Sequence, residues 1–496
     1  MLKQLYDSND ASSIFGYSGL LLGNTLAEAV KRIDSSCCIP FVENKSKGKL
    51  GNLVEEYFFG YKPNSDPRPD FPEAGVELKV TPLAQKKKGL AIKERLVIDM
   101  IDYVNITDIQ FEDSLLCKKF LLMLILFYIH DSGAQWQDMQ FVYSVLWAIK
   151  DKDLEIIKHD YYTIIDKIKE GKAHEISESD TYYLAACTKG KDGSSLRRQP
   201  FSKVLAKSRA FSLKASYMRT VLSFVANSGS NMATNTDVQP EFPQLVSVEE
   251  LRADSFENII KRRFEPYYGL DYIQLSEYLG MSIKAADKSK YARIAKHILR
   301  KGLKEYNDAE EIRKAGIIAK TIRIEKNGRI KEHMSFENID YQEIHETDDW
   351  ENSRWYEIVH SRMMLIVFRQ EDSYRGGWEK EKRYVLDKIV FTSLPDTVLA
   401  EAKEYWWNIK ENVEKDTLYD NNEETQKEKR NTFWRLSDGR HFHVRPKAQT
   451  SRDMTESPLT GEQVKKKCYW LDNKYLANVV RQAYGDEWEN KFRSNG

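Results

Sequence analysis

The sequence of 496 residues contains little of what marks several protein classes. It has only 24 glycines and 13 prolines, and 41% of its residues are hydrophobic, which excludes collagen-like and largely disordered chains. The five cysteines are odd in number and form no CxxC pair, which favours free thiols in a reducing compartment. The longest apolar run, residues 120–129, is shorter than the roughly 20 residues that cross a bilayer. We therefore expect a cytoplasmic protein with no membrane partner.

The chain also lacks an excess of either charge, since 76 Lys and Arg balance 76 Asp and Glu. Its bulk charge therefore names no partner, and any affinity for nucleic acid must come from local clusters. There is no GxxxxGK[ST] phosphate loop, and His174-Glu175 lacks the second histidine of an HExxH zinc motif. Nucleotide-driven motion and zincin chemistry are thus not indicated.

The length of the chain favours more than one domain. Residues 226–243 are polar, show no apolar periodicity and end in two prolines, so we predict a linker there between domains 1–225 and 244–496. Helical and strand-like periodicities alternate before it, which predicts an α/β or α+β fold with a mixed sheet. Residues 95–104 and 120–129 are predicted to be adjacent strands.

The first candidate site lies on a predicted strand in which apolar Val76, Leu78 and Val80 alternate with polar residues. Period-2 alternation places Glu77 and Lys79 together on the opposite face. Asp70 precedes a turn at Ala74-Gly75 that can bring its carboxylate beside Glu77, and Glu55 on the preceding predicted helix could complete the group. Two carboxylates make an oxygen-rich site suited to Mg²⁺, and Lys79 could orient or deprotonate a water. The alternative is that Glu77 and Lys79 form the solvent face of an amphipathic strand.

The sequence around this pattern resembles the MutH family of GATC-specific endonucleases. The similar segments, in the order of that family, are Gly23-Asn-Thr-Leu-Ala-Glu28, Gly51-Asn-Leu-Val-Glu55, Pro69-Asp-Phe-Pro-Glu-Ala-Gly-Val-Glu-Leu-Lys79 and Arg209-Ala-Phe-Ser-Leu-Lys214. The length of the chain, with Lys172-Ala-His-Glu175 and Ala186-Cys-Thr-Lys-Gly190, resembles the two-domain type II restriction enzymes that cut at GATC.

This resemblance implies a PD-(D/E)xK nuclease fold with catalytic Glu55, Asp70, Glu77 and Lys79. Asp70 and Glu77 would hold Mg²⁺, and Lys79 would be the catalytic lysine. The family has a further active-site lysine downstream. Lys118 and Lys119 lie in the right region, and the spacing leaves the choice between them open.

A local cationic cluster supports contact with DNA. Residues 186–219 contain nine Lys or Arg and one acidic residue, Asp192. A cluster of this kind can neutralise phosphates, although a solvated protein face is the common alternative. Its position matches the base-reading segment of the family, so the predicted DNA-binding residues of the first domain are Lys189, Lys191, Arg197, Arg209 and Lys214.

The second half resembles a degenerate copy of the first. Ala315-Gly-Ile-Ile-Ala-Lys320 aligns with Ala74-Gly-Val-Glu-Leu-Lys79, so that Lys320 is kept, Ile318 replaces Glu77 and Glu311 falls opposite Asp70. Arg445 and Lys447 lie in a segment similar to the DNA-reading loop, ahead of Tyr469-Trp-Leu-Asp-Asn-Lys474, which mirrors Phe211-Ser-Leu-Lys214. Because isoleucine cannot bind Mg²⁺, we expect a second domain that binds DNA as an allosteric effector but does not cut. A purely structural scaffold is the alternative.

The sequence thus predicts a Mg²⁺-dependent type II restriction endonuclease that hydrolyses double-stranded DNA at GATC. By resemblance, the cut falls 5′ of the G and leaves 5′-phosphates. One active site per chain predicts a transient homodimer on DNA, because a duplex has two strands to cut. The alternatives are a strand-specific nicking endonuclease of mismatch repair and a non-cleaving DNA-binding regulator.

Overall fold

The structure is a computed structural model that describes residues 5–40, 48–64, 66–86, 89–131, 133–190, 195–235, 242–371, 382–420, 427–446 and 453–492. The chain forms two compact units. The first comprises Met1–Ser255 together with Arg313–Ala315, and the second comprises Phe256–Ile312 and Gly316–Gly496. The boundary therefore lies later in the chain than the predicted linker, residues 226–243.

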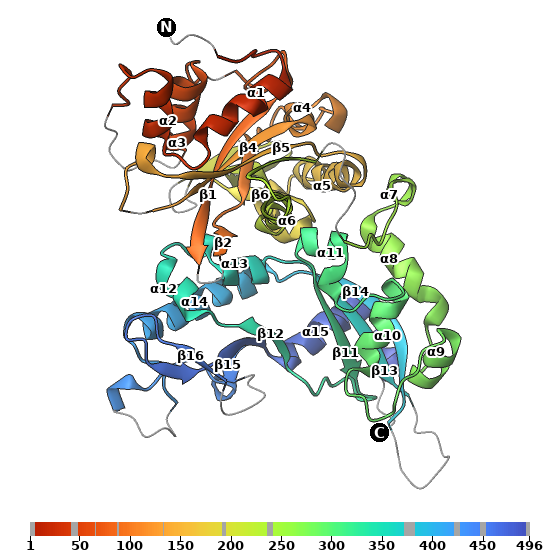
Figure 1. Cartoon of the computed structure of the whole chain (residues 1–496). Helices are drawn as coiled ribbons and strands as arrows, with labels where there is room; N and C mark the ends of the chain where they lie inside the picture. Colours follow the sequence, from red (N-terminus) through yellow and green to blue (C-terminus); the bar gives the residue numbers. More distant parts are fainter. Residues whose placement is uncertain are drawn as a thin grey trace. The chain divides into compact units, whose positions relative to one another are not determined.

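The first unit contains helices of differing length and ten strands among its described residues (Figure 1). The helices are α1 (Ala11–Ser18), α2 (Leu26–Ile33), α3 (Lys49–Leu53), the π-helix η2 (Val54–Phe59), α4 (Leu115–Leu121), α5 (Asp151–Lys169), α6 (Ala215–Asn227) and α7 (Val248–Ala253). The strands are β1 (Glu77–Lys86), β2 (Gly89–Ile92), β3 (Leu96–Met100), β4 (Met123–Ile129), β5 (Phe141–Trp147), β6 (Leu184–Thr188), β7 (Leu196–Gln199), β8 (Ser202–Lys207), β9 (Arg209–Leu213) and β10 (Met232–Thr234).

These strands form a mixed five-stranded sheet of order β10-β5-β4-β1-β2, a three-stranded sheet of order β3-β9-β6, and the two-stranded ribbon β7-β8. In the large sheet β1 and β4 are parallel, and β4 and β5 are antiparallel. Strands β3 and β4 belong to different sheets, so the predicted adjacency of residues 95–104 and 120–129 is wrong. Strand β10 pairs with β5, so the predicted linker contributes a strand to the first unit instead of leaving it. The mixed sheet itself is confirmed.

The core of the first unit lies around β4. Met123, Leu124, Ile125, Leu126 and Phe127 are all fully buried, because β4 has a strand on each side and is covered on both faces. This explains why the segment reads as a continuous apolar run instead of an alternating one. A cluster of aromatic rings from α1, η2 and the segment before β1 packs over one end of this core.

The second unit has the following elements in its described residues. The helices are α8 (Phe256–Phe264), α9 (Tyr272–Tyr278), α10 (Lys290–Leu299), α11 (Glu310–Ala315), α12 (Tyr341–Glu346), α13 (Arg354–Val359), α14 (Asp396–Glu414), α15 (Asn473–Tyr484) and α16 (Glu487–Phe492). The strands are β11 (Ile318–Ile324), β12 (Met334–Asn338), β13 (Met363–Gln370), β14 (Tyr384–Thr392), β15 (Phe442–Pro446), β16 (Met454–Glu456), β17 (Gln463–Lys465) and β18 (Lys467–Leu471).

The second unit repeats the sheet topology of the first. Sheet β11-β13-β14 has the same parallel and antiparallel pairings as β1-β4-β5, and sheet β12-β18-β15 corresponds to β3-β9-β6. A 19-residue helix follows β5 in one unit and β14 in the other, namely α5 and α14. The ribbon β16-β17 follows β15 and precedes β18 along the chain, as β7-β8 follows β6 and precedes β9 in the first unit. A duplicated nuclease fold, predicted from the order of the motifs, matches this repetition.

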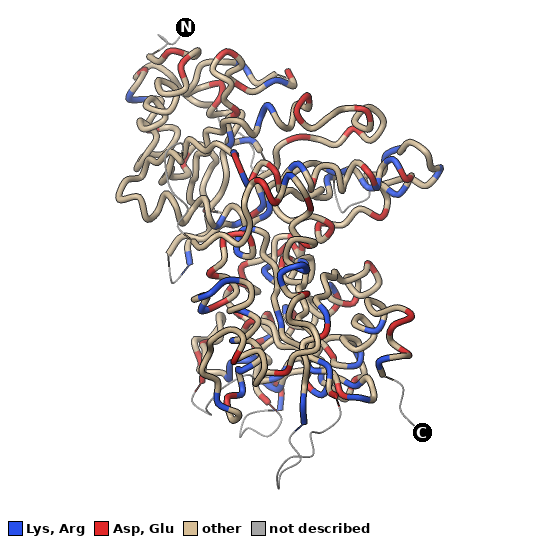
Figure 2. The backbone as a smooth tube through the Cα atoms, turned by 90° about the vertical axis from the view of Figure 1, so that its right-hand side faces the viewer, with Lys and Arg blue, Asp and Glu red and all other residues tan. Residues whose placement is uncertain are grey.

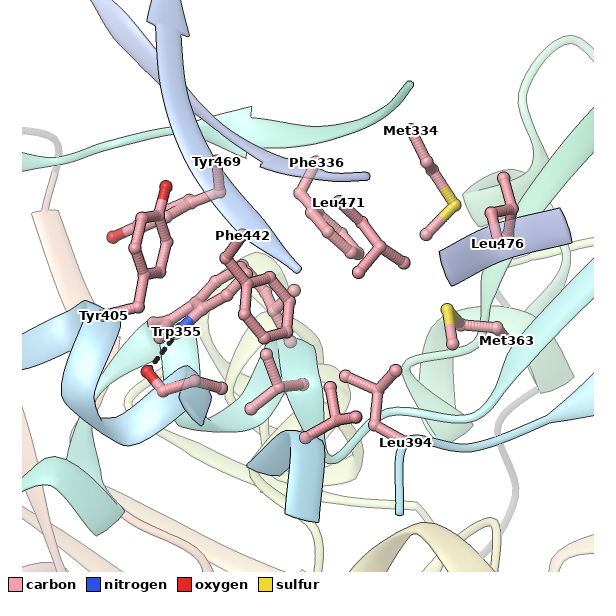
Figure 3. Packing of buried hydrophobic residues seen from close by; sticks show 14 of the residues in the cluster. Met334, Phe336, Trp355, Met363, Leu394, Tyr405, Phe442, Tyr469, Leu471 and Leu476 are labelled. Atoms are coloured by element: carbon pink, nitrogen blue, oxygen red, sulfur yellow. Dashed lines mark hydrogen bonds between the residues drawn. The ribbon is translucent and has the colours of Figure 1, made fainter. Parts of the chain in front are cut away.

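Large aromatic residues fill the core of the second unit. Trp355 on α13 stacks on Tyr469 of β18, with ring centroids 4.4 Å apart. Its indole N–H donates to the carbonyl of Ala402 on α14 at 3.0 Å, the bond drawn in Figure 3. Phe442 of β15 packs edge-on against the same indole. The small sheet, α13 and α14 therefore share one core, and the buried indole has its donor satisfied.

The charged side chains are mixed in sign along both units. Figure 2 shows Lys and Arg interspersed with Asp and Glu along the backbone. In the part of the chain that the structure describes, no helix is both long enough and apolar enough to cross a membrane.

Candidate active site

Glu77 and Lys79 lie on one face of β1, at its N-terminal end, as the alternation predicts. The Lys79 Nζ donates to the Glu77 Oε1 at 2.6 Å. Glu77 is only 2% exposed, and its backbone N–H donates to Leu122 at the start of the neighbouring parallel strand. A carboxylate buried this deeply is not the solvent face of an amphipathic strand. The structural alternative for this pair is therefore wrong.

The segment before β1 brings Asp70 back alongside that strand. Phe71 and Val76 exchange backbone hydrogen bonds across the turn, and Gly75 adopts a left-handed φ of 64° that closes it. The Asp70 Oδ2 then accepts the backbone N–H of Leu78 at 2.8 Å. Asp70 is thus fixed next to the residue between Glu77 and Lys79, as the predicted turn requires.

Glu55 joins this group electrostatically from the π-helix η2. Burial raises the pKa of Glu55 to about 7, and the neighbouring Asp70 raises it further while Lys79 opposes the shift. Burial and the Glu77 carboxylate likewise raise the pKa of Asp70 to about 6, against Lys79. One π-turn in a helix is often found at a functional site, and here it carries the residue that the sequence singled out. The three carboxylates therefore repel one another in a poorly solvated place.

The structure resolves the choice between the two downstream lysines. Lys119 on α4 is buried, and its Nζ lies 3.6 Å from the Glu77 Oε1 and 3.6 Å from the Asp99 Oδ1. Lys118, one residue earlier, is exposed. A helix turns by 100° per residue, so consecutive side chains leave it in different directions, and here that of Lys119 is the one directed at Glu77. Lys119 therefore belongs to the site.

Two residues of this neighbourhood were missed by sequence reasoning. Asp99 on β3 lies within reach of Lys119, and its only signal was a charge inside an apolar strand. Tyr61, just after η2, has a buried hydroxyl with no hydrogen-bond partner among the described residues. Burial raises the pKa of Tyr61, and Asp70 and Glu55 raise it further, which places the hydroxyl near both carboxylates.

The donor set suits a hard divalent cation. The Glu77 Oε2 is buried and accepts no hydrogen bond from the described residues, so it has a lone pair to offer. Within the described ranges no group of three or more His, Cys, Asp or Glu side chains is arranged closely enough to hold a metal ion by itself. Lys79 and Lys119 supply the positive charge beside Glu77 instead. Asp70 and Glu77 are carboxylates, the ligand type that Mg²⁺ prefers, and their repulsion would be relieved by such an ion.

Two of the predicted DNA-binding residues lie near each other at the base of the β7-β8 ribbon. Arg197 is exposed, and its Nε donates to the Ser208 Oγ at 2.9 Å. The backbone N–H of Lys189 donates to the Ser208 carbonyl at 2.7 Å. Both side chains are at least partly open to solvent and can reach a ligand. Lys191 and Lys447 fall outside the described residues.

Two other predicted DNA contacts serve the fold in this structure. Arg209 is buried, and its guanidinium donates to the Ala186 carbonyl on the paired strand at 2.6 Å. The Lys214 Nζ donates to the Thr181 carbonyl beside the start of α6. In each case the fold uses a donor of the cationic group to satisfy a backbone carbonyl. The sequence cluster therefore contains structural cations as well as exposed ones.

The second unit shows how far its copy of the site has diverged. Ile318 and Lys320 pair with Met363 and Leu365 in the register in which Glu77 and Lys79 pair with Met123 and Ile125. The backbone N–H of Ile318 donates to Arg362 as that of Glu77 donates to Leu122. Ile318 thus occupies the position of Glu77, as the alignment predicts. Glu311, aligned with Asp70, is buried on α11.

Arg445, the remaining predicted DNA-binding residue, lies at the end of β15. It is exposed, and its guanidinium is 5.2 Å from the centroid of the Trp470 ring on the paired strand. Stacking of this kind holds an arginine in place without using its hydrogen-bond donors. Arg445 is therefore presented to solvent beside the Trp470 ring.

Comparison with known proteins places these residues in a family. A family model described as DNA mismatch repair enzyme MutH matches residues 59–160, a range that includes Asp70, Glu77, Lys79 and Lys119. The type II restriction enzyme Sau3AI of Staphylococcus aureus is 32% identical over 471 residues, covering 90% of each chain. The DNA mismatch repair protein MutH of Shewanella woodyi is 26% identical over 36% of this chain and 77% of its own length.

A MutH protein of a further Shewanella strain is 23% identical, over 45% of this chain and 99% of its own length. Less than half of the present chain thus matches nearly a whole MutH protein, whereas the match to Sau3AI covers 90% of the chain. The mixed sheet, the buried Glu77–Lys79 pair and the near full-length similarity to Sau3AI lead to one conclusion: the chain belongs to the MutH-like family of nucleases with the PD-(D/E)xK fold, and within it to the relatives of the type II restriction enzyme Sau3AI.

Proposed function

We propose that this protein is a type II restriction endonuclease that hydrolyses double-stranded DNA at GATC with Mg²⁺. The cut would fall 5′ of the G and leave 5′-phosphates. The observation that carries the proposal is the buried Glu77 with Lys79 and Lys119 on it, beside Asp70, in the segment that matches the MutH family. The near full-length similarity to a restriction enzyme favours restriction over repair.

In the proposed mechanism Asp70 and Glu77 would hold the metal through their carboxylates. A bound Mg²⁺ would supply charge stabilisation for the scissile phosphate and the leaving oxygen. Lys79 lies on Glu77 and is positioned to orient the attacking water by donating a hydrogen bond to its oxygen. The oxygen of that water bonds to phosphorus and releases its proton to solvent, while the bond to the 3′-oxygen breaks and that oxygen takes a proton from solvent, which leaves the phosphate on the 5′ side and a 3′-hydroxyl. Lys119 keeps a second positive charge next to Glu77, where negative charge accumulates on phosphorus.

The second unit would bind a further GATC site and activate the first unit allosterically. Ile318 in the position of Glu77 supports the loss of cutting, and exposed Arg445 supports retention of DNA contact. The alternative is that the second unit only stabilises the first. A comparison of plasmids with one and with two GATC sites tests this: faster cutting of the two-site plasmid is expected. Equal rates at every enzyme concentration would favour the scaffold.

One site per chain further implies that two chains act on one duplex. We expect a transient dimer about the two-fold axis of the palindrome, with a rate that rises more steeply than linearly with enzyme concentration. A strictly linear dependence with long-lived nicked intermediates would count against dimerisation.

The decisive experiment uses an unmethylated plasmid with several GATC sites, incubated with the protein in Mg²⁺ or in EDTA. Fragments that match the GATC map, formed only in Mg²⁺, are the expected result. Nicked circles alone would favour a repair-type nickase, the second candidate, for which the MutH match is the supporting observation. An intact plasmid of altered mobility would indicate a non-cleaving DNA-binding regulator.

A further inference from the structure

The two-stranded ribbon β7-β8 exposes large apolar side chains at its tip and along its length. Phe201, in the turn, is 74% exposed, and Leu196, Val204 and Leu205 are each about half exposed. Single exposed apolar residues are ordinary, but four on one twelve-residue ribbon form a concentration that marks interaction surfaces. Phe201 contributes the largest of these side chains.

The backbone under Phe201 is fixed even though its side chain is free. Phe201 has a left-handed φ of 61°, a conformation that a bulky residue rarely adopts. Buried Gln199 accepts the Ala173 N–H at 2.7 Å and donates to the Val204 carbonyl at 2.6 Å, which ties the turn to the body of the unit. Gly171 lies so close that an added Cβ would stand 2.7 Å from the Phe201 carbonyl oxygen. The aromatic ring is thus held outward from a rigid base.

The charge of the ribbon identifies the kind of partner. Arg197, Arg198, Lys203 and Lys207 are all exposed on it, and residues 195–207 contain no acidic residue. An apolar tip surrounded only by cations is suited to a polyanion that also offers apolar surface. Stacked base pairs between two phosphate backbones have this combination.

We propose that the β7-β8 ribbon is a DNA wedge. Phe201 inserts between neighbouring base pairs from one groove and unstacks them, while the four cationic side chains neutralise phosphates on either side. This rests on the proposed function only in that the substrate is duplex DNA. It adds a deformation of the duplex that the active site does not require, and it assigns that deformation to one side chain.

The second unit provides a matched ribbon that lacks this concentration of exposed cations. In β16-β17 the exposed apolar residue between the strands is Leu459, and Glu456 and Glu462 are exposed on the strand and beside it. Residues 454–465 expose no Lys or Arg side chain that could neutralise phosphate, so the corresponding substitution there should leave DNA unstacking unchanged. Leu459→Ala is therefore the control for Phe201→Ala.

The test uses full-length protein with Glu77→Ala, which prevents cutting, and GATC duplexes that carry 2-aminopurine at successive positions. Unstacking raises the fluorescence of this base. With the parent we expect the fluorescence to rise at one base step on binding. In Phe201→Ala this rise should be lost and the affinity for the duplex should fall about tenfold. The rise should be kept in part in Phe201→Leu and in full in Leu459→Ala. Because the ring is exposed, the thermal midpoint of Phe201→Ala should equal that of the parent.

No fluorescence rise with the parent, or an equal rise with Phe201→Ala, would overturn the wedge. So would a Phe201-dependent dimer in sedimentation without DNA, or Phe201-dependent binding to anionic vesicles, each of which assigns the ribbon to another partner. A plasmid left uncut in Mg²⁺, with Phe201-dependent unstacking still present, would refute the proposed function and leave the wedge standing.

Discussion

The two units share one backbone arrangement and differ in what they bury at the start of its parallel strand pair. In the first unit that position holds Glu77, with Lys119 on the adjacent helix. In the second it holds Ile318, and the end of α13 carries apolar Ile358 and Val359 where α4 carries Lys119. A buried ion pair stabilises a fold little, because the desolvation of two charges offsets their attraction. The sheet register can therefore persist without the charges, which indicates that function, not folding, retains them in the first unit.

The largest effect should follow from removing Glu77. Glu77→Ala is expected to lower the cleavage rate by at least about 1,000-fold, since it removes several kcal/mol of charge stabilisation at the reacting phosphate. Binding to a GATC duplex in Ca²⁺ should persist, as a gel shift would measure. Adding Ile318→Glu to this variant should not restore cleavage, because the second unit also lacks a lysine in the position that Lys119 holds in the first unit. Recovery of cutting would mean that the second unit is still a nuclease.

Removal of the neighbouring lysine should come next. We expect Lys119→Ala to lower the cleavage rate by about 10²–10³-fold, the usual cost of losing one group that stabilises transition-state charge. Lys118→Ala is the matched control, since it removes the same charge one residue away on the exposed side of α4. Single-turnover rates with saturating enzyme make the comparison. Equal losses in both variants would place Lys119 outside the chemistry.

A third difference between the units concerns pH. His443 of β15 is fully buried, and burial, with His333 and Arg445, lowers the pKa of this imidazole to about 4. Ala185 of β6 holds the corresponding place in the first unit. The unfolded chain takes up a proton below pH 6.5 while the folded imidazole stays neutral, so stability is full above that pH and falls as pH drops toward 4. The expected loss is up to about 3 kcal/mol.

Urea unfolding followed by tryptophan fluorescence at pH 7.5 and 5 would measure this loss. His443→Phe, which keeps an aromatic ring and removes the titrating group, should reduce the pH dependence of the midpoint. An unchanged dependence in His443→Phe would show that other groups cause it.

The smallest effect separates exposed from buried cations within the predicted DNA-binding set. Arg197→Ala should weaken DNA binding severalfold and lower the slope of log K against log salt by about 1, because one phosphate contact is lost. Arg209→Met should leave that slope unchanged and reduce stability by about 1–3 kcal/mol, since it leaves the Ala186 carbonyl without its donor. A reduced slope of log K against log salt in Arg209→Met would show that Arg209 contacts DNA after all.

Local pattern was sufficient where one element or one turn fixes the geometry. Alternation alone places Glu77 and Lys79 side by side, and the turn at Gly75 alone returns Asp70 to them. The choice of Lys119 over Lys118 was out of reach, because it depends on which side of α4 meets the sheet. The separation of β3 from β4 was equally hidden, since both are apolar and strand partners are chosen by the whole fold.

The sequence by itself therefore determined the residue types of the site, their order along the chain and the repetition of that order in the second half. Tertiary structure alone decided which cationic side chains are buried and donate to backbone carbonyls, as Arg209 does, and which remain exposed, as Arg197 does. It also decided that residues 232–234 join the first sheet instead of linking two domains. The physical reason is the same in each case: spacing along a strand or turn is fixed by bond geometry, whereas burial depends on what the rest of the chain brings to that point.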